Sequence, residues 1–163
     1  MIDEAHATYA MDQGSAYRDE SWGGHVPGES PLQKQVLALF RLLDVTPENV
    51  LAGNLVPFRS RDWGSLASPK ESLEFGKQLW ADVLRCAQPP LVITMGAMAT
   101  SAIAEVVKAG NMTKHPTGWG NVMMSTGVYP GGLLVGLPHL SRFGIVTRQV
   151  GARVLRDVFD GSK

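Results

Sequence analysis

The chain has 163 residues, 44% of them hydrophobic and 18% charged, which is typical of a single folded domain and excludes a disordered protein. Fifteen Lys and Arg residues balance fifteen Asp and Glu residues, so any nucleic-acid surface must be a local patch. One cysteine excludes an internal disulfide and favours an intracellular, cytoplasmic protein. No apolar run approaches the ~18–20 residues of a membrane span, and the polar N-terminus is unlike a secretory signal.

The N-terminal part predicts a loop followed by a helix. Residues 1–29 contain Gly, Asp and Ser throughout and are expected to be mostly loop. A helix is predicted to begin after Ser30, because Ser30, Pro31 and Gln33 match a capping box with proline in the first turn. Apolar residues at helical spacing support it: Leu32, Val36, Leu39, Phe40 and Leu43.

The next segment predicts a strand, a loop and a second helix. Residues 49–58 are short, apolar and closed by a proline, which indicates a buried strand ending in a loop. The helix is expected to begin after Ser68, where Ser, Pro and Glu repeat the capping pattern. Its predicted inner face has five members: Leu73, Gly76, Trp80, Val83 and Leu84.

The second half of the chain again alternates strand and helix. Residues 89–96 predict a buried strand, followed by a helix of small residues that ends at Gly110. Two strands are expected around the Pro-Gly-Gly turn at 130–132, and then a final helix with Ser141 as its N-cap. This alternation predicts one α/β domain over 1–163, a three-layer α/β/α sandwich with a mostly parallel central sheet.

Three segments follow predicted strands and are therefore candidate site segments. They are the loop after Asn54, the turn at Gly96 and "PHLSRF" at 138–143. Ligands bind such sheets at the carboxyl ends of the strands, where loops and free backbone groups gather. We therefore expect a site at this edge of the sheet.

Asn54 and two arginines stand out in the first of these segments. An unpaired amide within an apolar strand would cost about 1–3 kcal/mol, and the donor and acceptor of Asn54 suit the edge of a nucleobase. The alternative is an asparagine that bonds a neighbouring loop. Arg59 and Arg61 would hold phosphates, or else bond carboxylates such as Asp62.

Further candidates are an aromatic residue and the polar group near the C-terminus. Trp22 lies beside two glycines, where it would stack on a flat ligand or fill the core. His139 and Arg142 flank the predicted helix start at Ser141, and a helix N-terminus attracts phosphate. The alternative for this segment is a capped helix with a structural histidine.

Several chemistries lack their sequence signatures. The glycine-rich motifs of P-loop and Rossmann proteins, the Gly-x-Ser-x-Gly motif of hydrolases and the His-Glu-x-x-His motif of zinc enzymes do not occur. Four scattered histidines and one cysteine have no metal-ligand spacing. We expect no metal and no cofactor.

Three segments taken in order resemble the uracil-DNA glycosylase superfamily. They are "SWGGHVPGESPLQKQVLALFRLLDVTPENVLAGNLVPFRSRDW", "LVITMG" and "LLVGLPHLSRF", and the resemblance covers roughly residues 17–160. Its most specific parts are "GNLVPFRS" and "LPHLSRF", which looks like a variant of the superfamily's second motif, usually His-Pro-Ser. The resemblance implies a uracil-DNA glycosylase-like fold.

The resemblance also implies an activity and a set of site residues. Such proteins flip a nucleotide out of the duplex and cleave the bond between base and sugar. By position, Asn54 would read the flipped base, and Trp22 would stack on it. His139 would hydrogen-bond the base carbonyl and stabilise the anionic leaving base. Ser141 and Arg142 would grip phosphate and fill the gap left in the duplex.

The resemblance departs from the superfamily at the first motif. That motif ends the first strand and supplies a polar residue that activates or positions water, and neither strand nor motif appears in the first residues here. Either the sequence begins after the motif, or the protein lacks it.

We expect an intracellular monomer that binds DNA carrying uracil or a modified base and excises that base. Two alternatives stay open: a non-catalytic DNA- or nucleotide-binding module, and an unrelated α/β protein in which Asn54 and His139 are structural.

Overall fold

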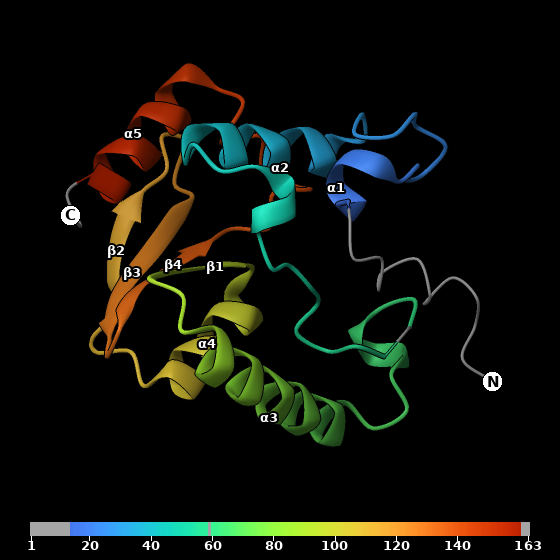
Figure 1. The fold of residues 1–163 in the computed structure, drawn as a ribbon. Coiled ribbons are helices and arrows are strands. Elements are labelled where there is room, and N and C mark those ends of the chain that lie inside the picture. Colours follow the sequence, from blue (N-terminus) through green and yellow to red (C-terminus); the bar gives the residue numbers. More distant parts are fainter. Residues whose placement is uncertain (1–13, 59, 161–163) are drawn as a thin grey trace. The chain divides into compact units, whose positions relative to one another are not determined.

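The computed structural model describes residues 14–58 and 60–160, which form a mixed α/β structure (Figure 1). The described residues divide into two compact units. Unit 1 runs up to Leu51 and resumes at Leu140, and unit 2 is Ala52–His139. The α/β class predicted from the sequence is confirmed.

Unit 1 is helical within the described residues. Its elements are α1 (Ala16–Asp19), α2 (Pro31–Leu42), the 3₁₀ helix η3 (Pro47–Asn49) and α5 (Gln149–Asp160) (Figure 1). The capping box predicted for α2 is present: the Gln33 N–H donates to Ser30 Oγ at 3.3 Å, and the Ser30 N–H donates to Gln33 Oε1 at 3.1 Å. α2 buries three apolar side chains of its predicted stripe: Val36, Leu39 and Phe40.

Replacing Ser30 with alanine is expected to lower the free energy of unfolding by about 1 kcal/mol, because the Gln33 N–H loses its acceptor. Ser68→Ala is the matched control. Ser68 is also an N-cap before a proline, but its side chain makes no capping hydrogen bond. Denaturant unfolding of both variants tests the difference, and equal losses would contradict it.

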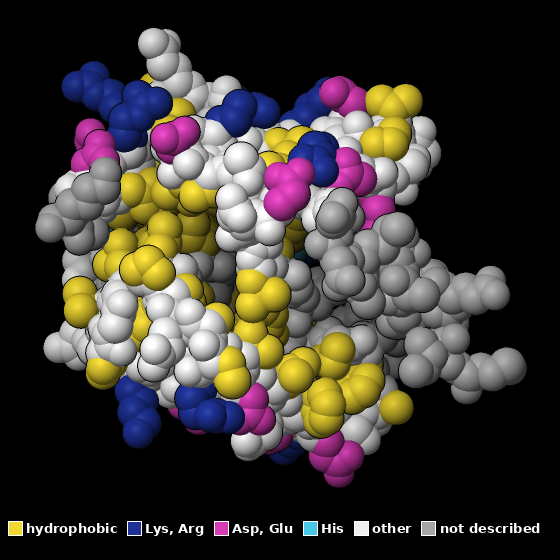
Figure 2. Space-filling model, in the orientation of Figure 1, with side chains coloured by type: hydrophobic (Ala, Val, Ile, Leu, Met, Phe, Trp, Pro, Cys, Tyr) yellow, Lys and Arg dark blue, Asp and Glu magenta, His cyan; other side chains and the backbone are white. Residues whose placement is uncertain are grey.

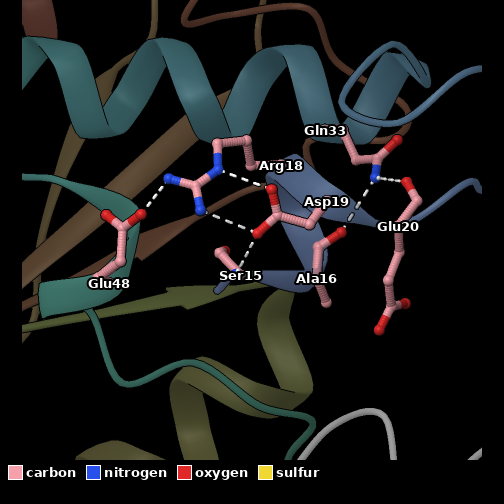
Figure 3. Close-up of polar contacts among 7 residues, drawn as sticks. All are labelled: Ser15, Ala16, Arg18, Asp19, Glu20, Gln33 and Glu48. Atoms are coloured by element: carbon pink, nitrogen blue, oxygen red, sulfur yellow. Dashed lines mark hydrogen bonds and ion pairs between the residues drawn. The ribbon is translucent and has the colours of Figure 1, made fainter. Parts of the chain in front are cut away.

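The buried Gln33 also holds the short helix α1 in place. Its Nε2 donates to Ala16 O at 3.0 Å and to Glu20 O at 2.7 Å (Figure 3). The guanidinium of Arg18 bonds Asp19 and reaches across to Glu48 (Figure 3). A helical turn at 16–19 therefore interrupts the region predicted as loop; residues 1–13 lie outside the described part of the chain.

The last helix begins later than the sequence predicted. α5 starts at Gln149, so Ser141 is not its N-cap. Residues before α5 form turns that a side chain of α2 secures, since Gln35 Oε1 accepts the Val146 N–H at 2.8 Å. A Cβ on Gly151 would lie 2.3 Å from the carbonyl oxygen of Ile145, so α5 packs tightly on this turn. These contacts, which come from distant residues, set the helix start.

Unit 2 contains one sheet of four strands. They are β1 (Leu91–Met95), β2 (Thr113–Pro116), β3 (Met123–Tyr129) and β4 (Gly132–Leu137), in the order β1-β4-β3-β2. Only β1 and β4 are parallel; β3 is antiparallel to both of its neighbours. The prediction of a mostly parallel sheet is therefore wrong. The turn at Pro130-Gly131 is too short for a crossover, so β3 and β4 form an antiparallel hairpin.

Two helices pack in unit 2. α4 (Ala97–Val107) lies against β1 and β4, and α3 (Pro69–Ala87) lies against α4 (Figure 1). α4 ends on Lys108 with a left-handed backbone (φ 54°) and not at Gly110 as predicted. The Gly110 N–H instead donates to Val128 O at 2.8 Å, which joins the helix end to β3. Side chains of α4 and the sheet form the core: Ala102, Ile103, Met124, Leu134, Val135 and Leu137.

The buried strand predicted at 49–58 does not form. Residues up to Asn49 make a 3₁₀ turn, and the described residues from Val50 to Phe58 are irregular and partly exposed. Within the described part of the chain, no helix combines the length and apolar character that a membrane span requires.

Candidate functional site

His139 and Gly96 meet at the carboxyl edge of the parallel strand pair. Met95 at the end of β1 is in register with Leu137 at the end of β4, so both chains leave the sheet at the same edge. The Gly96 N–H donates to Leu137 O at 2.8 Å. A Cβ on Gly96 would lie 3.9 Å from Cδ2 of His139. Two of the three segments expected at a strand-end site are therefore adjacent.

A pair of threonines fixes the turn at Gly96. Thr100 Oγ1 donates to Gly96 O at 2.9 Å and lies 2.8 Å from Thr94 Oγ1. Gly136 of β4 makes room for this arrangement, because a Cβ there would lie 2.3 Å from Thr100 Cγ2. Sequence reasoning missed both threonines. Their signal was a hydroxyl on either side of Gly96 at the join between a strand and a helix.

The amino end of α4 lies beside His139. Gly96 is the N-cap of α4, has φ +96° and provides no side-chain cap, so the first turn of α4 has N–H groups without a capping side chain. A helix N-terminus carries a partial positive charge that favours a nearby anion. The imidazole of His139 is exposed at this end of α4. The arrangement combines a histidine with a potential that stabilises negative charge.

Asn54 is held on α3 through its backbone. Trp80 Nε1 donates to Asn54 O at 3.0 Å, and a Cβ on Gly76 would lie 2.3 Å from Leu55 O. Asn54 is exposed and not part of a strand, so the burial cost inferred from the sequence does not arise. α3, and not the sheet, positions this asparagine.

Trp22 makes several contacts within unit 1. Its ring is half-buried and meets Tyr17 edge to face, with centroids 5.3 Å apart, and Tyr17 in turn meets Phe40 at 6.1 Å. Its Nε1 donates to Glu20 Oε2 at 2.9 Å. These contacts match the alternative in which Trp22 packs on the core, and stacking on a base stays a prediction.

The described residues expected to bind DNA, which are Ser141, Arg142 and Arg61, lie on exposed loops. Ser141 and Arg142 are exposed in the turns that precede α5, so they do not flank its N-terminus. Arg61 Nε lies 3.3 Å from Asp62 Oδ2, and 91% of the Arg61 side chain is exposed. Hydrogen bonds from the Ser65 hydroxyl, the Ser65 N–H and Arg61 lower the pKa of the Asp62 carboxyl. Arg59 lies outside the described residues.

The candidate residues are distributed over both units. Asn54, Arg61 and His139 belong to unit 2, whereas Trp22, Ser141 and Arg142 belong to unit 1. The chain passes from one unit to the other at 51–52 and at 139–140. Asn54 and His139 are therefore next to the two points where the chain crosses between units.

Comparisons with protein-family models, with curated proteins and with solved structures each gave no match. Among the described residues, no three His, Cys, Asp or Glu side chains form a group that would hold a metal ion. Among the described residues, the strongest candidate site is His139 with Gly96 at the carboxyl edge of β1 and β4.

Proposed function

We propose that this protein is a DNA glycosylase-like enzyme of the uracil-DNA glycosylase superfamily. It would flip uracil or a modified base out of DNA and cleave its N-glycosidic bond. The observation that carries the proposal is His139, exposed at the carboxyl end of β4 and next to the N-cap of α4. In this proposal the mixed sheet belongs to a uracil-DNA glycosylase-like α/β/α fold.

The proposed chemistry is stabilisation of the departing base. Breaking the bond between base and sugar leaves negative charge on the base, and a fixed donor aimed at that charge lowers the barrier. His139 would donate a hydrogen bond to the base carbonyl. The N-terminus of α4 would add a favourable potential, because the first-turn N–H groups and the helix dipole both favour an anion.

Base recognition is assigned to Asn54. Its carboxamide has a donor and an acceptor, which together match the polar edge of a pyrimidine. The contacts of Gly76 and Trp80 fix the backbone around this carboxamide, so little conformational freedom of the backbone would be lost on binding. Trp22 would stack on the base, and Ser141, Arg142, Arg59 and Arg61 would contact the DNA backbone.

Asp19, three residues before Trp22, is poorly suited to activate water. Asp19 accepts hydrogen bonds from Arg18 and from the Ser15 N–H, and these hold its pKa below the ordinary value. A carboxylate with a lowered pKa is a weak base. The proposed catalysis therefore depends mainly on leaving-group stabilisation by His139.

Base release from synthetic oligonucleotides tests the proposal. Single strands and duplexes carrying uracil, hypoxanthine or modified cytosines and thymines would be incubated with the protein, and abasic sites detected as alkali-labile breaks. We expect release from at least one substrate. Absence of DNA binding in low salt together with absence of release would reject the proposal.

A non-catalytic DNA- or nucleotide-binding module of the same fold is the second candidate. The observation that favours it is Asp19, whose carboxylate accepts hydrogen bonds from Arg18 and the Ser15 N–H and is therefore a weak base for activating water. Salt-sensitive binding to the same oligonucleotides without release from any of them would select this function.

A further inference from the structure

Unit 2 presents three aromatic rings to solvent, on the segment that follows Asn54 and on α3. Phe58 is 49% exposed, Phe75 51% and Trp63 38%. The rings of Phe58 and Phe75 are in contact, with centroids 5.2 Å apart and planes tilted by 44°. Figure 2 shows hydrophobic side chains gathered over η4 (Trp63–Ser65) and the beginning of α3. We call Phe58, Trp63 and Phe75 the aromatic surface. Phe58 and Phe75 form a contiguous exposed pair, and exposed apolar patches of this kind mark binding surfaces.

The backbone that carries the aromatic surface is fixed by local contacts. Phe75 is on α3, and the segment that leads to Phe58 is held on the same helix at Gly76. Trp63 opens η4, whose N-cap Asp62 accepts the Ser65 N–H at 2.9 Å. Rings on a preorganised backbone bind a ligand at low cost in conformational entropy.

The aromatic surface is bordered by charges of both signs, since α3 carries Glu71 and Glu74 within four residues of Phe75, and the cation offered to a phosphate is Arg61. Arg61 lies between Phe58 and Trp63 in the chain, and its side chain is 91% exposed. Lys70 is exposed in the first turn of α3. Asp62 already bonds Arg61 and Ser65, which reduces its repulsion of an approaching phosphate.

Exposed rings with an exposed arginine between them in the chain match the chemistry of a single-stranded nucleic acid. Unpaired bases stack on aromatic side chains, and the guanidinium group binds phosphate or stacks in turn. A duplex offers only its backbone to such a surface, because its bases are stacked on each other. A protein partner would use the rings without needing the cation.

We propose that the aromatic surface binds single-stranded DNA, with successive unpaired bases on Phe58 and Phe75 and a phosphate on Arg61. The inference rests on the proposed function and names the strand state of its substrate. Phe58 follows Asn54 by four residues, which span at most about 14 Å of extended chain. A strand on the aromatic surface would therefore deliver a neighbouring base to Asn54.

Fluorescence anisotropy with a labelled twelve-nucleotide oligo(dT), alone and paired with oligo(dA), tests this inference. We expect the single strand to bind more tightly than the duplex. Phe75→Leu is expected to weaken single-strand binding by about 5-fold or more, because it keeps an apolar side chain but removes the stacking ring. Phe75→Tyr is expected to keep the affinity. The association constant falls as salt rises, and Arg61→Gln should make the plot of its logarithm against log salt concentration less steep by about 0.7.

Val128→Ala is the matched control, because Val128 is 71% exposed on β3 of the same unit and carries no ring. We expect it to bind as the unaltered protein does. Equal affinity for strand and duplex, or unchanged binding by Phe75→Leu, would overturn the inference. Self-association that Phe75→Leu abolishes, with DNA binding unchanged, would overturn it too and identify a surface for a second copy.

The outcomes separate this inference from the proposed function. Base release that depends on His139 but not on Phe75 would contradict DNA binding by the aromatic surface and would support the proposed glycosylase function. Single-strand binding that depends on Phe75, without base release from any substrate, would contradict the proposed glycosylase function and would support DNA binding by the aromatic surface.

Discussion

Replacing His139 with alanine is expected to slow base release by about 10²–10³-fold, the loss typical of one donor to a developing anion. His139 is exposed at the end of β4, so the substitution removes the donor without opening a cavity in the core. Affinity for undamaged DNA should stay the same, because the interaction forms only as the base departs. Single-turnover release on the best substrate, with anisotropy for binding, measures both quantities.

Two further variants make this prediction specific. His139→Gln keeps a hydrogen-bond donor and is expected to recover part of the rate. His25→Ala removes an exposed histidine of unit 1 that the proposal does not use, and it should release base at the normal rate. If His139→Ala releases base as fast as His25→Ala, His139 is not the catalytic residue.

The sequence predicted those elements whose signals are local. Ser30 with Gln33 marks the start of α2, and the Pro-Gly-Gly turn produces the hairpin of β3 and β4. In both cases the residues that give the signal also make the hydrogen bonds or the turn. Such features do not depend on residues far away in the chain, so a single sequence is enough to find them.

The errors arose where distant residues determine the local structure. The apolar segment 49–58 matches a buried strand in composition, but its backbone packs on Gly76 and bonds Trp80, and it does not join the sheet. Ser141 matches an N-cap, but Gln35 holds residues 146 and 147 in a turn and delays α5 to Gln149. Neither contact has a signature in the segment itself.

The candidate site shows the same division. The rule that sites gather at strand ends places Gly96 and His139 together, because β1 and β4 are the one parallel pair among the described strands. The rule fails for Asn54, which leaves no strand and is positioned by a helix. Thr94 and Thr100 were missed because their role depends on the space that Gly136 leaves above β4.

Gly76→Ala is expected to disturb both stability and base recognition. The new Cβ would lie 2.3 Å from Leu55 O, and this oxygen belongs to backbone that cannot rotate away. Overpacking of this kind costs about 1–3 kcal/mol, and the better helix propensity of alanine returns up to about 1 kcal/mol. We expect a net loss of about 1–2 kcal/mol in the free energy of unfolding, with the segment from Asn54 to Val56 displaced from α3.

Gly64→Ala is the control for this prediction, because the nearest atom to its new Cβ is Asp62 Oδ1 at an ordinary 3.5 Å. It should change stability by less than about 0.5 kcal/mol. Displacement of Asn54 should raise the KM of Gly76→Ala for the modified strand more than it lowers kcat, since His139 belongs to a different element. Denaturant unfolding and steady-state release measure these effects. Normal stability in Gly76→Ala would show that α3 does not hold the Asn54 segment. The proposal that α3 positions Asn54 to bind the base would then be wrong.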